Sequence, residues 1–284
     1  MKNMYEYNEV VKKMRFFFQE AKGFVEVPAQ SRQSILAACE DPATISQYIF
    51  SGVNWPLPQT GQMWLERDLL DNPKVDGVFC ITTSYRNEPN PVEGRHDKIF
   101  PMFEFESHGG MDEMIKLETE LLDHLGFGSG EPFHKSYPQI KYDDASEKYG
   151  VEELGYDEEA AMCKEIGDCT FLTHFPLRTH PFWNMKHAGN GIYNKVDVIM
   201  HGMETIGSAE RATDTYEMRE QFHNISDGEY ANLLYNHFGK KRVEDELEEY
   251  LSLDMFERFG GGIGVTRMVS AMKSHGLLLD TGNM

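Results

Sequence analysis

The chain has 284 residues, of which 40% are hydrophobic and 12% aromatic, a composition typical of a globular protein with one large core. Its 47 acidic and 27 basic residues give a formal net charge of −20, which disfavours a protein that holds nucleic acid through its phosphates. No apolar run approaches the length of a membrane span, and the N-terminal MKNMYEYNEVVKKM lacks the apolar centre of a signal peptide. We therefore expect a cytoplasmic protein.

The N-terminal half predicts helices that alternate with strands. The expected elements are a helix over 7–22, a strand over 24–28, a helix over 59–71, and strands over 77–86 and 99–106. Gly23 is a natural end for the first helix. On the last strand, alternation places Glu104 and Glu106 on the same face, after a loop that is dense in charge.

The C-terminal half continues the same mixture of helices and strands. We expect a helix over 111–125, a small insertion rich in Gly, Pro and acidic residues over 127–169, strands over 192–200 and 203–211, and helices over 215–223 and 228–238. The acidic stretches 143–168 and 244–257 are interpreted as solvated helix faces. The segment 259–273, FGGGIGVTRMVSAMK, predicts a glycine-rich strand that leads into a helix.

The glycine-rich segment GGGIGVTR at 260–267 superficially resembles a phosphate-binding loop. It lacks the Lys-Ser/Thr pair of a P-loop, and no second βαβ half follows it, so a dinucleotide fold is disfavoured. Glycines here let a ligand or another backbone approach a strand closely, with Arg267 as a fixed charge. Taken alone, a simple packing turn explains the segment equally well.

Three segments occur together in one order: EVVKKMRFFFQEAKGFVEVP, YRNE…RHDKIFPMFEFE and GGGIGVTR. They resemble the three motifs of class II aminoacyl-tRNA synthetases. QTGQMWLE at 59–66, RHDKIFPMFEFE at 95–106 and DVIMHGMETIGSAER at 197–211 further resemble the catalytic domain of the aspartyl/asparaginyl branch. The resemblance covers nearly the whole chain, and the expected domain spans residues 1–284. It implies an α+β fold, an antiparallel sheet flanked by helices, formed as a single catalytic domain.

The resemblance also implies a site for ATP at the charged strand ends. In this family Arg86 would hold the α-phosphate, Glu88 the adenine side, and Arg95 and His96 the β- and γ-phosphates. Phe100 would stack on the adenine, and Arg267 would cover the other face of the ring and reach the γ-phosphate. Arg86 and Arg267 are the expected catalytic residues. Negative charge grows on the α-phosphate oxygens as pyrophosphate leaves, and fixed guanidinium groups stabilise that transition state.

The family resemblance assigns Mg²⁺ to two carboxylates, Asp197 and Glu204, on neighbouring predicted strands. Magnesium prefers carboxylate oxygens together with the phosphates of its substrate. Either residue alone would be interpreted as an ordinary surface acid.

The expected amino-acid pocket contains Gln62, Glu104 and Arg211. In this branch Arg211 would meet the end of the substrate side chain, and aspartate-specific members carry a lysine where this chain has Leu65. The combination resembles an asparagine-type pocket, so the expected substrate is an Asx amino acid. An alternative is that Glu104 and Arg211 form a buried ion pair, which is compatible with a role in binding.

Full synthetases of this branch carry an N-terminal anticodon-binding domain, and this chain begins at the motif-one helix. We therefore expect an AMP-forming ligase that makes asparagine from aspartate and ammonia. One alternative is a truncated asparaginyl-tRNA synthetase paralogue that aminoacylates tRNA or another carrier, and another is a non-catalytic paralogue that binds an amino acid or nucleotide. A homodimer is expected through the motif-one helix and strand, because the aromatic run 16–18 exceeds what one core-facing stripe buries.

Overall fold

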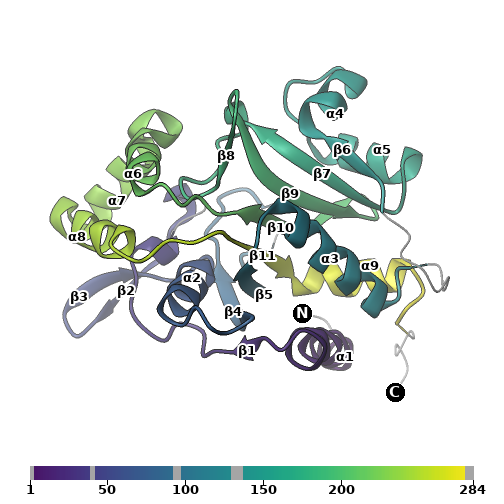
Figure 1. Cartoon of the computed structure of the whole chain (residues 1–284), viewed down its shortest axis with the longest axis horizontal. Coiled ribbons are helices and arrows are strands. Elements are labelled where there is room, and N and C mark those ends of the chain that lie inside the picture. Colours follow the sequence, from purple (N-terminus) through teal and green to yellow (C-terminus); the bar gives the residue numbers. More distant parts are fainter. Residues whose placement is uncertain (1–2, 39–41, 92–96, 129–136, 279–284) are drawn as a thin grey trace.

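The computed structural model describes residues 3–38, 42–91, 97–128 and 137–278, and a nine-stranded sheet runs through this part of the chain (Figure 1). Its strands are β1 (Val25–Glu26), β4 (Gly77–Tyr85), β5 (Ile99–His108), β6 (Gln139–Lys141), β7 (Cys169–Pro176), β8 (His187–Gly189), β9 (Ile192–Met200), β10 (Met203–Glu210) and β11 (Arg258–Gly264). The strand order is β1-β4-β5-β11-β10-β9-β7-β6, and β8 pairs with β9. The β1–β4 and β6–β7 pairs are parallel and the other pairs are antiparallel, which confirms the expected sheet type.

Helices cover both faces of this sheet. They are α1 (Met4–Arg15) with its π-helical continuation η1 (Phe16–Ala21), α2 (Gln62–Asp71), α3 (Met111–Leu125), α4 (Tyr142–Tyr149), α5 (Tyr156–Glu165), α6 (Thr215–Asn224), α7 (Glu229–Phe238), α8 (Lys240–Leu251) and α9 (Val265–Ser274). Short 3-10 turns occupy Leu36–Ala38, Pro42–Thr44, Leu177–Thr179 and Ile225–Gly228, and a separate hairpin pairs β2 (Gln47–Phe50) with β3 (Val53–Pro56). No helix in the described part of the chain is long and apolar enough to cross a membrane.

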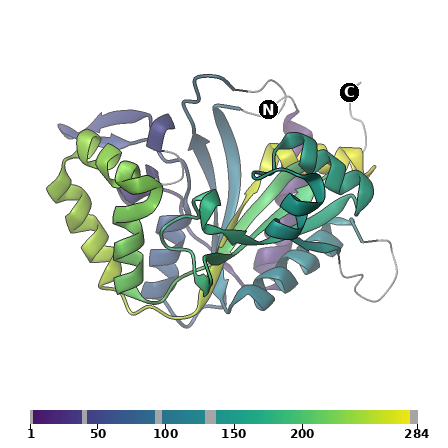
Figure 2. The ribbon, with the colours of Figure 1, turned by 90° about the horizontal axis from the view of Figure 1, so that it is seen from above.

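The main core lies where α1, α3 and α9 pack on one face of the sheet, and these helices group together in Figures 1 and 2. Strand alternation supplies the sheet side of this core, because Phe103 and Phe105 point toward the helices while Glu104 and Glu106 point away. The Phe18 ring lies 5.0 and 5.1 Å from the rings of Phe103 and Phe105. Aromatic packing therefore fixes the sheet against the first helix.

The other face of the sheet carries the functional cavity. Helices α6, α7 and α8 gather at one end of the molecule and form a second apolar cluster with α2 and Trp183, whereas α4 and α5 cover β7 and β9 at the other end (Figure 1). Because these layers cover the ends of the sheet, the middle strands β5, β11 and β10 stay accessible from this side.

The first helix differs from the expectation in one respect, because the helical spacing changes at Phe16. The wider π-helical turn lets both Phe17 and Phe18 reach the core, and Phe16 alone stays exposed, at 57%. The sequence pattern also did not predict β2, β3, β6, β7 or β8. Within the expected insertion 127–169, the described residues form β6, α4 and α5, and β6 extends the edge of the main sheet.

One acidic residue is buried in the main core. Glu118 of α3 is fully inaccessible, and burial raises the pKa of its carboxyl group to about 8, an effect that the Ser208 hydroxyl opposes only in part. The carboxyl group of Glu118 therefore holds its proton more tightly in the folded protein than in the unfolded chain. The contribution to stability is complete below the ordinary pKa of 4.5 and is lost as the pH rises toward about 8.

We predict that the free energy of unfolding falls as the pH rises between about 5 and 8, with Glu118 contributing up to about 1.4 kcal/mol per pH unit. Glu118→Gln should flatten this dependence, because glutamine cannot ionise. Urea unfolding of the two proteins across this pH range measures the difference, with the exposed Glu153→Gln as a matched control. Parallel pH profiles for wild type and Glu118→Gln would contradict this role for burial.

Candidate active site

A cavity of about 710 Å³ opens over the middle strands on the face opposite α1, α3 and α9. Its wall includes eight of the residues singled out in the sequence: Gln62, Arg86, Glu88, Phe100, Glu104, Glu204, Arg211 and Arg267. Asp197 lies next to this wall, beside Gly207. Arg95 and His96 lie outside the described residues. The described residues predicted for ATP, the amino acid and the metal therefore converge on one site.

The floor of the cavity is the glycine-rich strand β11. A methyl group added at Gly260 would lie 1.6 Å from Oε2 of Glu106 and 2.6 Å from the carbonyl oxygen of Phe105. No side chain fits in that space, so glycine is required for the carboxylate of Glu106 to lie across the strand. The sequence led us to expect a ligand or another backbone close to these glycines, and the group that lies against Gly260 is instead the side chain of Glu106.

Arg211 lies on this floor and is held by three hydrogen bonds to side chains. Its Nε and Nη2 donate to the two carboxylate oxygens of Glu106 at 3.1 and 3.2 Å, and Nη2 also donates to Oε1 of Gln62 at 2.7 Å. Gln62 is held in turn, because its Nε2 donates to the Gly261 carbonyl at 2.7 Å. The other terminal nitrogen, Nη1, has no hydrogen-bond partner among the described residues and so remains able to bind a ligand.

The pairing differs from the alternative considered for the sequence, because Arg211 pairs with Glu106 and not with Glu104. The fully buried Glu104 accepts hydrogen bonds from the hydroxyls of Thr60 and Thr82 and from the backbone N–H of Gly61, at 2.8 Å. Gly61 is the N-cap of α2, whose positive end favours a carboxylate. Glu104 therefore anchors α2 to β4 and β5.

A second layer of charged side chains, which the sequence pattern did not predict, lies beneath Arg211. Oε2 of Glu66 lies 2.7 Å from Nη2 of Arg258, which is completely buried, and Oε1 accepts a hydrogen bond from Asn184 at 2.7 Å. Tyr250 donates its hydroxyl proton to the same carboxylate. Burial alone would raise the pKa of Glu66, but the two arginines lower it. Two buried arginines thus balance two buried glutamates.

The pKa of Glu106 is shifted in the opposite direction from the pKa of Glu66. Burial raises the pKa of Glu106 to about 7, against the opposing effect of Arg211. Leu65 is fully buried in a cluster with Leu69, Val78 and Cys80 and is not part of the cavity wall. Leu65, the position at which the family resemblance implies a lysine in aspartate-specific members, is therefore packed among apolar side chains.

Arg86, Phe100 and Arg267, the residues expected to bind the nucleotide, also line the cavity. The guanidinium group of Arg86 lies 5.6 Å from the centre of the Phe100 ring. Nη1 of Arg267 donates to the backbone carbonyl of Glu204 at 2.8 Å and lies 3.7 Å from the Glu204 carboxylate. Both arginines line the cavity, so two positive charges face the space that a triphosphate would need.

Asp197 and Glu204 converge beside Gly207. A methyl group at Gly207 would lie 2.9 Å from Oε1 of Glu204 and 3.5 Å from Oδ1 of Asp197. Oδ2 of Asp197 accepts from Lys195 at 2.7 Å, but the buried Oδ1 has no hydrogen-bond partner among the described residues. Burial raises the pKa of Asp197 to about 7, and Lys195 opposes this shift. A buried oxygen without a partner beside a second carboxylate fits a cation that takes oxygen ligands.

Comparison with known proteins places this site in a family. Residues 1–276 match the family described as tRNA synthetases class II (D, K and N). The fold is similar to asparaginyl-tRNA synthetase from Pyrococcus horikoshii complexed with asparaginyl-adenylate, with a TM-score of 0.74 and 22% identity over 94% of this chain and 64% of that one. The fold is also similar to Entamoeba histolytica asparaginyl-tRNA synthetase in complex with asparaginyl-adenylate. The TM-score is 0.73 and the sequence identity is 17%, over 95% of this chain and 63% of that one.

Aspartyl tRNA synthetase from Entamoeba histolytica is a further structural relative, with a TM-score of 0.66 and 18% identity over 94% of this chain and 54% of that one. The chain thus spans less than two thirds of the length of each of these structures. These matches show a catalytic-domain fold of the class II type, with a large sheet flanked by helices.

We predict that Gly260→Ala displaces Glu106 from Arg211, because the new methyl group would occupy the position of the carboxylate. The free energy of unfolding should fall by about 3 kcal/mol, because breaking the pair leaves buried charges without partners, although the intact pair itself adds little net stability. Denaturant unfolding measures the change. Gly110→Ala is the matched control, because its added methyl group would lie no closer than 3.4 Å to another group. Equal stability of Gly260→Ala and wild type would contradict this account of the floor.

Proposed function

Because the chain belongs to the class II tRNA synthetases of the aspartate, lysine and asparagine group, we propose that it is an ATP-dependent, AMP-forming ligase for an Asx amino acid. We further propose that it converts aspartate to asparagine with ammonia. The observation that carries the proposal is the single cavity into which Arg86, Arg267 and Arg211 all project. A cytoplasmic location belongs to the same proposal, because the reaction consumes ATP.

ATP would lie along the side of the cavity that holds Arg86 and Arg267. Phe100 offers a ring face for adenine, Glu88 lines the adenine side, and Arg95 and His96 are proposed for the terminal phosphates. The guanidinium groups bind the oxygens where charge develops as the bond between the α-phosphate and pyrophosphate breaks. Fixed charges of this kind accelerate the step more than they strengthen ground-state binding.

Asp197 and Glu204 would hold Mg²⁺, which supplies positive charge to the phosphates when bound. The support for this assignment is the partnerless Oδ1 of Asp197 beside Oε1 of Glu204. Arg267 also binds the backbone of Glu204, so the nucleotide side and the proposed metal ligands share one support.

The amino acid would be gripped by Arg211, Gln62 and the surroundings of Glu104. Nη1 of Arg211 can donate to one carboxylate of aspartate, while the pairing with Glu106 keeps the guanidinium plane fixed. For asparagine synthesis, the α-carboxylate of aspartate meets Arg211 and the β-carboxylate faces the α-phosphate. The orientation of the bound aspartate therefore decides which acyl group is activated.

The proposed reaction has two steps. An oxygen of the β-carboxylate attacks the α-phosphorus, the bond to pyrophosphate breaks, and β-aspartyl adenylate forms. Ammonia then attacks the β-carbonyl carbon, loses a proton, and displaces AMP with the electrons of the acyl-oxygen bond. Ammonia is small and neutral, so it needs only an open approach to that carbon.

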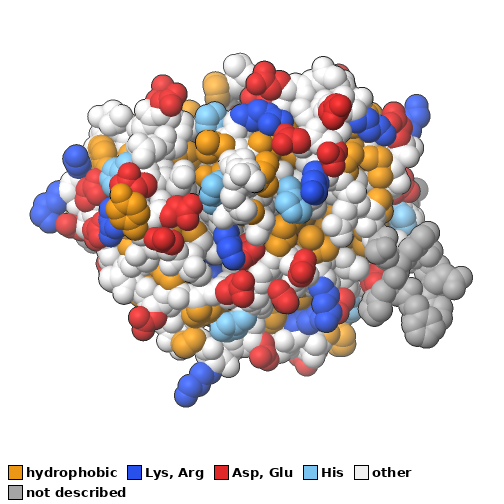
Figure 3. Space-filling view, turned by 45° about the horizontal axis from the view of Figure 1, so that its top comes forward, with side chains coloured by type: hydrophobic (Ala, Val, Ile, Leu, Met, Phe, Trp, Pro, Cys, Tyr) orange, Lys and Arg blue, Asp and Glu red, His pale blue; other side chains and the backbone are white. Residues whose placement is uncertain are grey.

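Aminoacylation of tRNA or another carrier is the second candidate. Structural similarity to two asparaginyl-tRNA synthetases complexed with asparaginyl-adenylate favours it. The net charge of −20 disfavours an RNA partner, because RNA binding usually needs a basic surface. On the face drawn in Figure 3, Lys and Arg side chains are scattered among acidic ones. A non-catalytic binding paralogue is disfavoured, because a sensor would not need the metal carboxylates.

A homodimer built on α1 and β1 belongs to the proposal. Phe16 at 57% exposure and Val25 at 46% are apolar side chains that a second copy would cover. Sedimentation velocity at micromolar concentration should show a dimer. A monomer under these conditions would contradict the proposed dimer, but it would not test the proposed ligase reaction.

The function is tested by incubating the protein with ATP and Mg²⁺ and with aspartate or asparagine, with and without ammonium. We predict that AMP and asparagine accumulate only with aspartate and ammonium together. If hydroxylamine traps only the α-hydroxamate, and no asparagine forms at any ammonium concentration, the α-carboxylate is the group activated. Aminoacylation of tRNA or another carrier would then replace asparagine synthesis as the proposed function.

Variants test the residue roles in the same assay. Arg86→Ala and Arg267→Ala should each lower AMP formation about 10²- to 10³-fold, because each removes a charge near the phosphates. Arg211→Lys should lower kcat/KM for aspartate about 100-fold and spare ATP binding, since lysine keeps the charge beside Glu106 but lacks the planar donors. Arg219→Leu is the control, because this exposed arginine pairs with Glu248 on the surface. Near-normal turnover in all three site variants would mean that the site is misplaced.

A further inference from the structure

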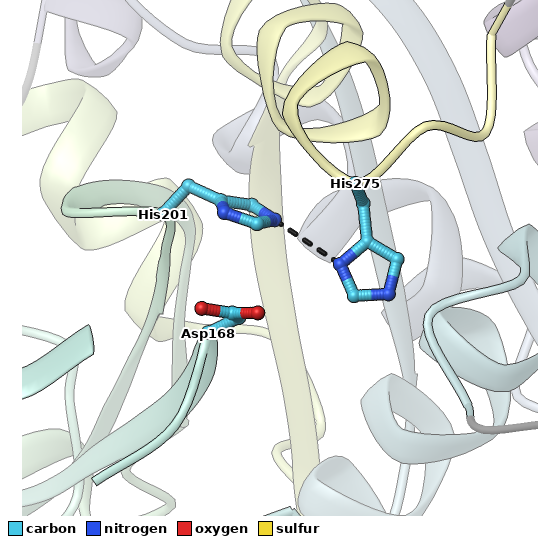
Figure 4. A group of neighbouring side chains, drawn as sticks. All are labelled: Asp168, His201 and His275. Atoms are coloured by element: carbon cyan, nitrogen blue, oxygen red, sulfur yellow. Dashed lines mark hydrogen bonds between the residues drawn. The ribbon is translucent and has the colours of Figure 1, made fainter. Parts of the chain in front are cut away.

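A second cluster of ligand-forming side chains lies outside the cavity. Asp168, His201 and His275 each bring one nitrogen or oxygen atom to the same point, with all of these atoms within 4.8 Å of one another (Figure 4). Among the described residues this is the one group of three His, Cys, Asp or Glu side chains that converges in this way. None of the three residues lines the active-site cavity.

The three residues come from distant parts of the chain. Asp168 immediately precedes β7, His201 forms the turn between β9 and β10, and His275 follows the last residue of α9. The backbone N–H of His201 donates to the backbone carbonyl of Asp168 at 2.8 Å, so these two residues are held together independently of their side chains. Packing of α9 in the main core fixes the position of the third.

The turn at His201 is tightly defined. His201 has φ of +49° and the following Gly202 has φ of +81°, as in the two-residue turns that join antiparallel strands. A methyl group at Gly202 would lie 3.2 Å from the α-carbon of Ala160, so α5 also packs on this turn. The imidazole of His201 is therefore presented from a rigid support.

The spacing of the ring nitrogens suits metal coordination. Nε2 of His201 lies 3.2 Å from Nδ1 of His275. Two nitrogens bound to one tetrahedral zinc ion at ~2.0–2.1 Å are about 3.3 Å apart, so little rearrangement is needed. Figure 4 shows the Asp168 carboxylate beside both rings, where it can provide the third ligand. A hydrogen bond between two neutral imidazoles is the competing explanation for the short distance, and it makes no use of the carboxylate.

We propose that Asp168, His201 and His275 bind a Zn²⁺ ion, with water as the fourth ligand. Two imidazoles and one carboxylate are the ligand types that zinc accepts, whereas Mg²⁺ prefers oxygen ligands throughout. Asp168 is exposed and the two histidines are half-buried, so solvent can reach the fourth position. The site is chemically distinct from the carboxylate pair at Asp197 and Glu204.

A bound ion would join elements that also carry the active site. The turn at His201 closes the two strands on which Asp197 and Glu204 lie, and His275 ends the helix that carries Arg267. Coordination would tie the end of α9 to this hairpin and to the start of β7. An ion that binds only the folded protein raises its thermal stability by mass action.

Zinc binding is measured on the full chain without a polyhistidine tag, after removal of metal with a chelator. Zn²⁺ alone is added in competition with a chromophoric zinc indicator, and Mg²⁺ is present in excess. We expect one Zn²⁺ per chain and a zinc-dependent rise in Tm. His201→Asn and His275→Gln should each weaken binding at least ~10-fold and remove the rise in Tm, and Asp168→Asn should weaken it less.

The variants are chosen to preserve the fold. Asparagine tolerates positive φ, so His201→Asn keeps the turn, and His275 lies beyond the last turn of its helix. His124→Gln, which alters a histidine on α3, is the matched control and should bind zinc like wild type. If circular dichroism shows that His201→Asn does not fold, zinc binding by His275→Gln and Asp168→Asn tests the proposal instead. Absence of zinc binding in wild type, or unchanged binding in the histidine variants, would overturn the proposal.

Discussion

The buried pairing of Arg211 with Glu106 is the contact on which the architecture of this site depends. Both side chains lie on a strand surface that Gly260 leaves free, and a single methyl group there would collide with the carboxylate. A buried ion pair of this kind contributes little net stability, because desolvation offsets much of the attraction. It does fix the position and plane of the guanidinium group, and a binding pocket needs both.

The second layer explains how such a pair survives in the interior. Glu66 and Arg258 extend the pair into a balanced network, and Tyr250 and Asn184 complete the hydrogen bonds of the Glu66 carboxylate. Three of these residues come from α2, α8 and β11, so the network also joins the helical layer to the sheet. The same contacts that hold Arg211 in place thereby hold the cavity open between the layers.

Much of this architecture could be predicted from the sequence, because local periodicity and ordered motifs both carried information. Alternation correctly placed Glu104 and Glu106 on one face, and the motif order correctly indicated the antiparallel sheet. The partner of Arg211 could not be predicted, since Glu104 and Glu106 share that face. The choice depends on tertiary contacts, because Thr60 and Thr82 bind Glu104 while Gly260 leaves room for the Glu106 carboxylate. Glu66 and Arg258 were missed for a similar reason, because nearly 200 residues separate them and one helix and one strand bring them together.

The functional residues divide in the same way. Asp197 and Glu204 lie near each other on the neighbouring strands of a hairpin, and their role as metal ligands, which the family resemblance implied, stays a prediction. The convergence of Asp168, His201 and His275 depends instead on packing between segments far apart in the chain. We propose that Arg211 binds a carboxylate of the substrate while Arg86 and Arg267 hold the nucleotide. A crystal structure of the protein with Mg²⁺, aspartate and a non-hydrolysable ATP analogue tests it most directly. The account predicts aspartate on Nη1 of Arg211 with its other carboxylate toward the α-phosphate. Aspartate bound elsewhere, or phosphates away from Arg86 and Arg267, would contradict it.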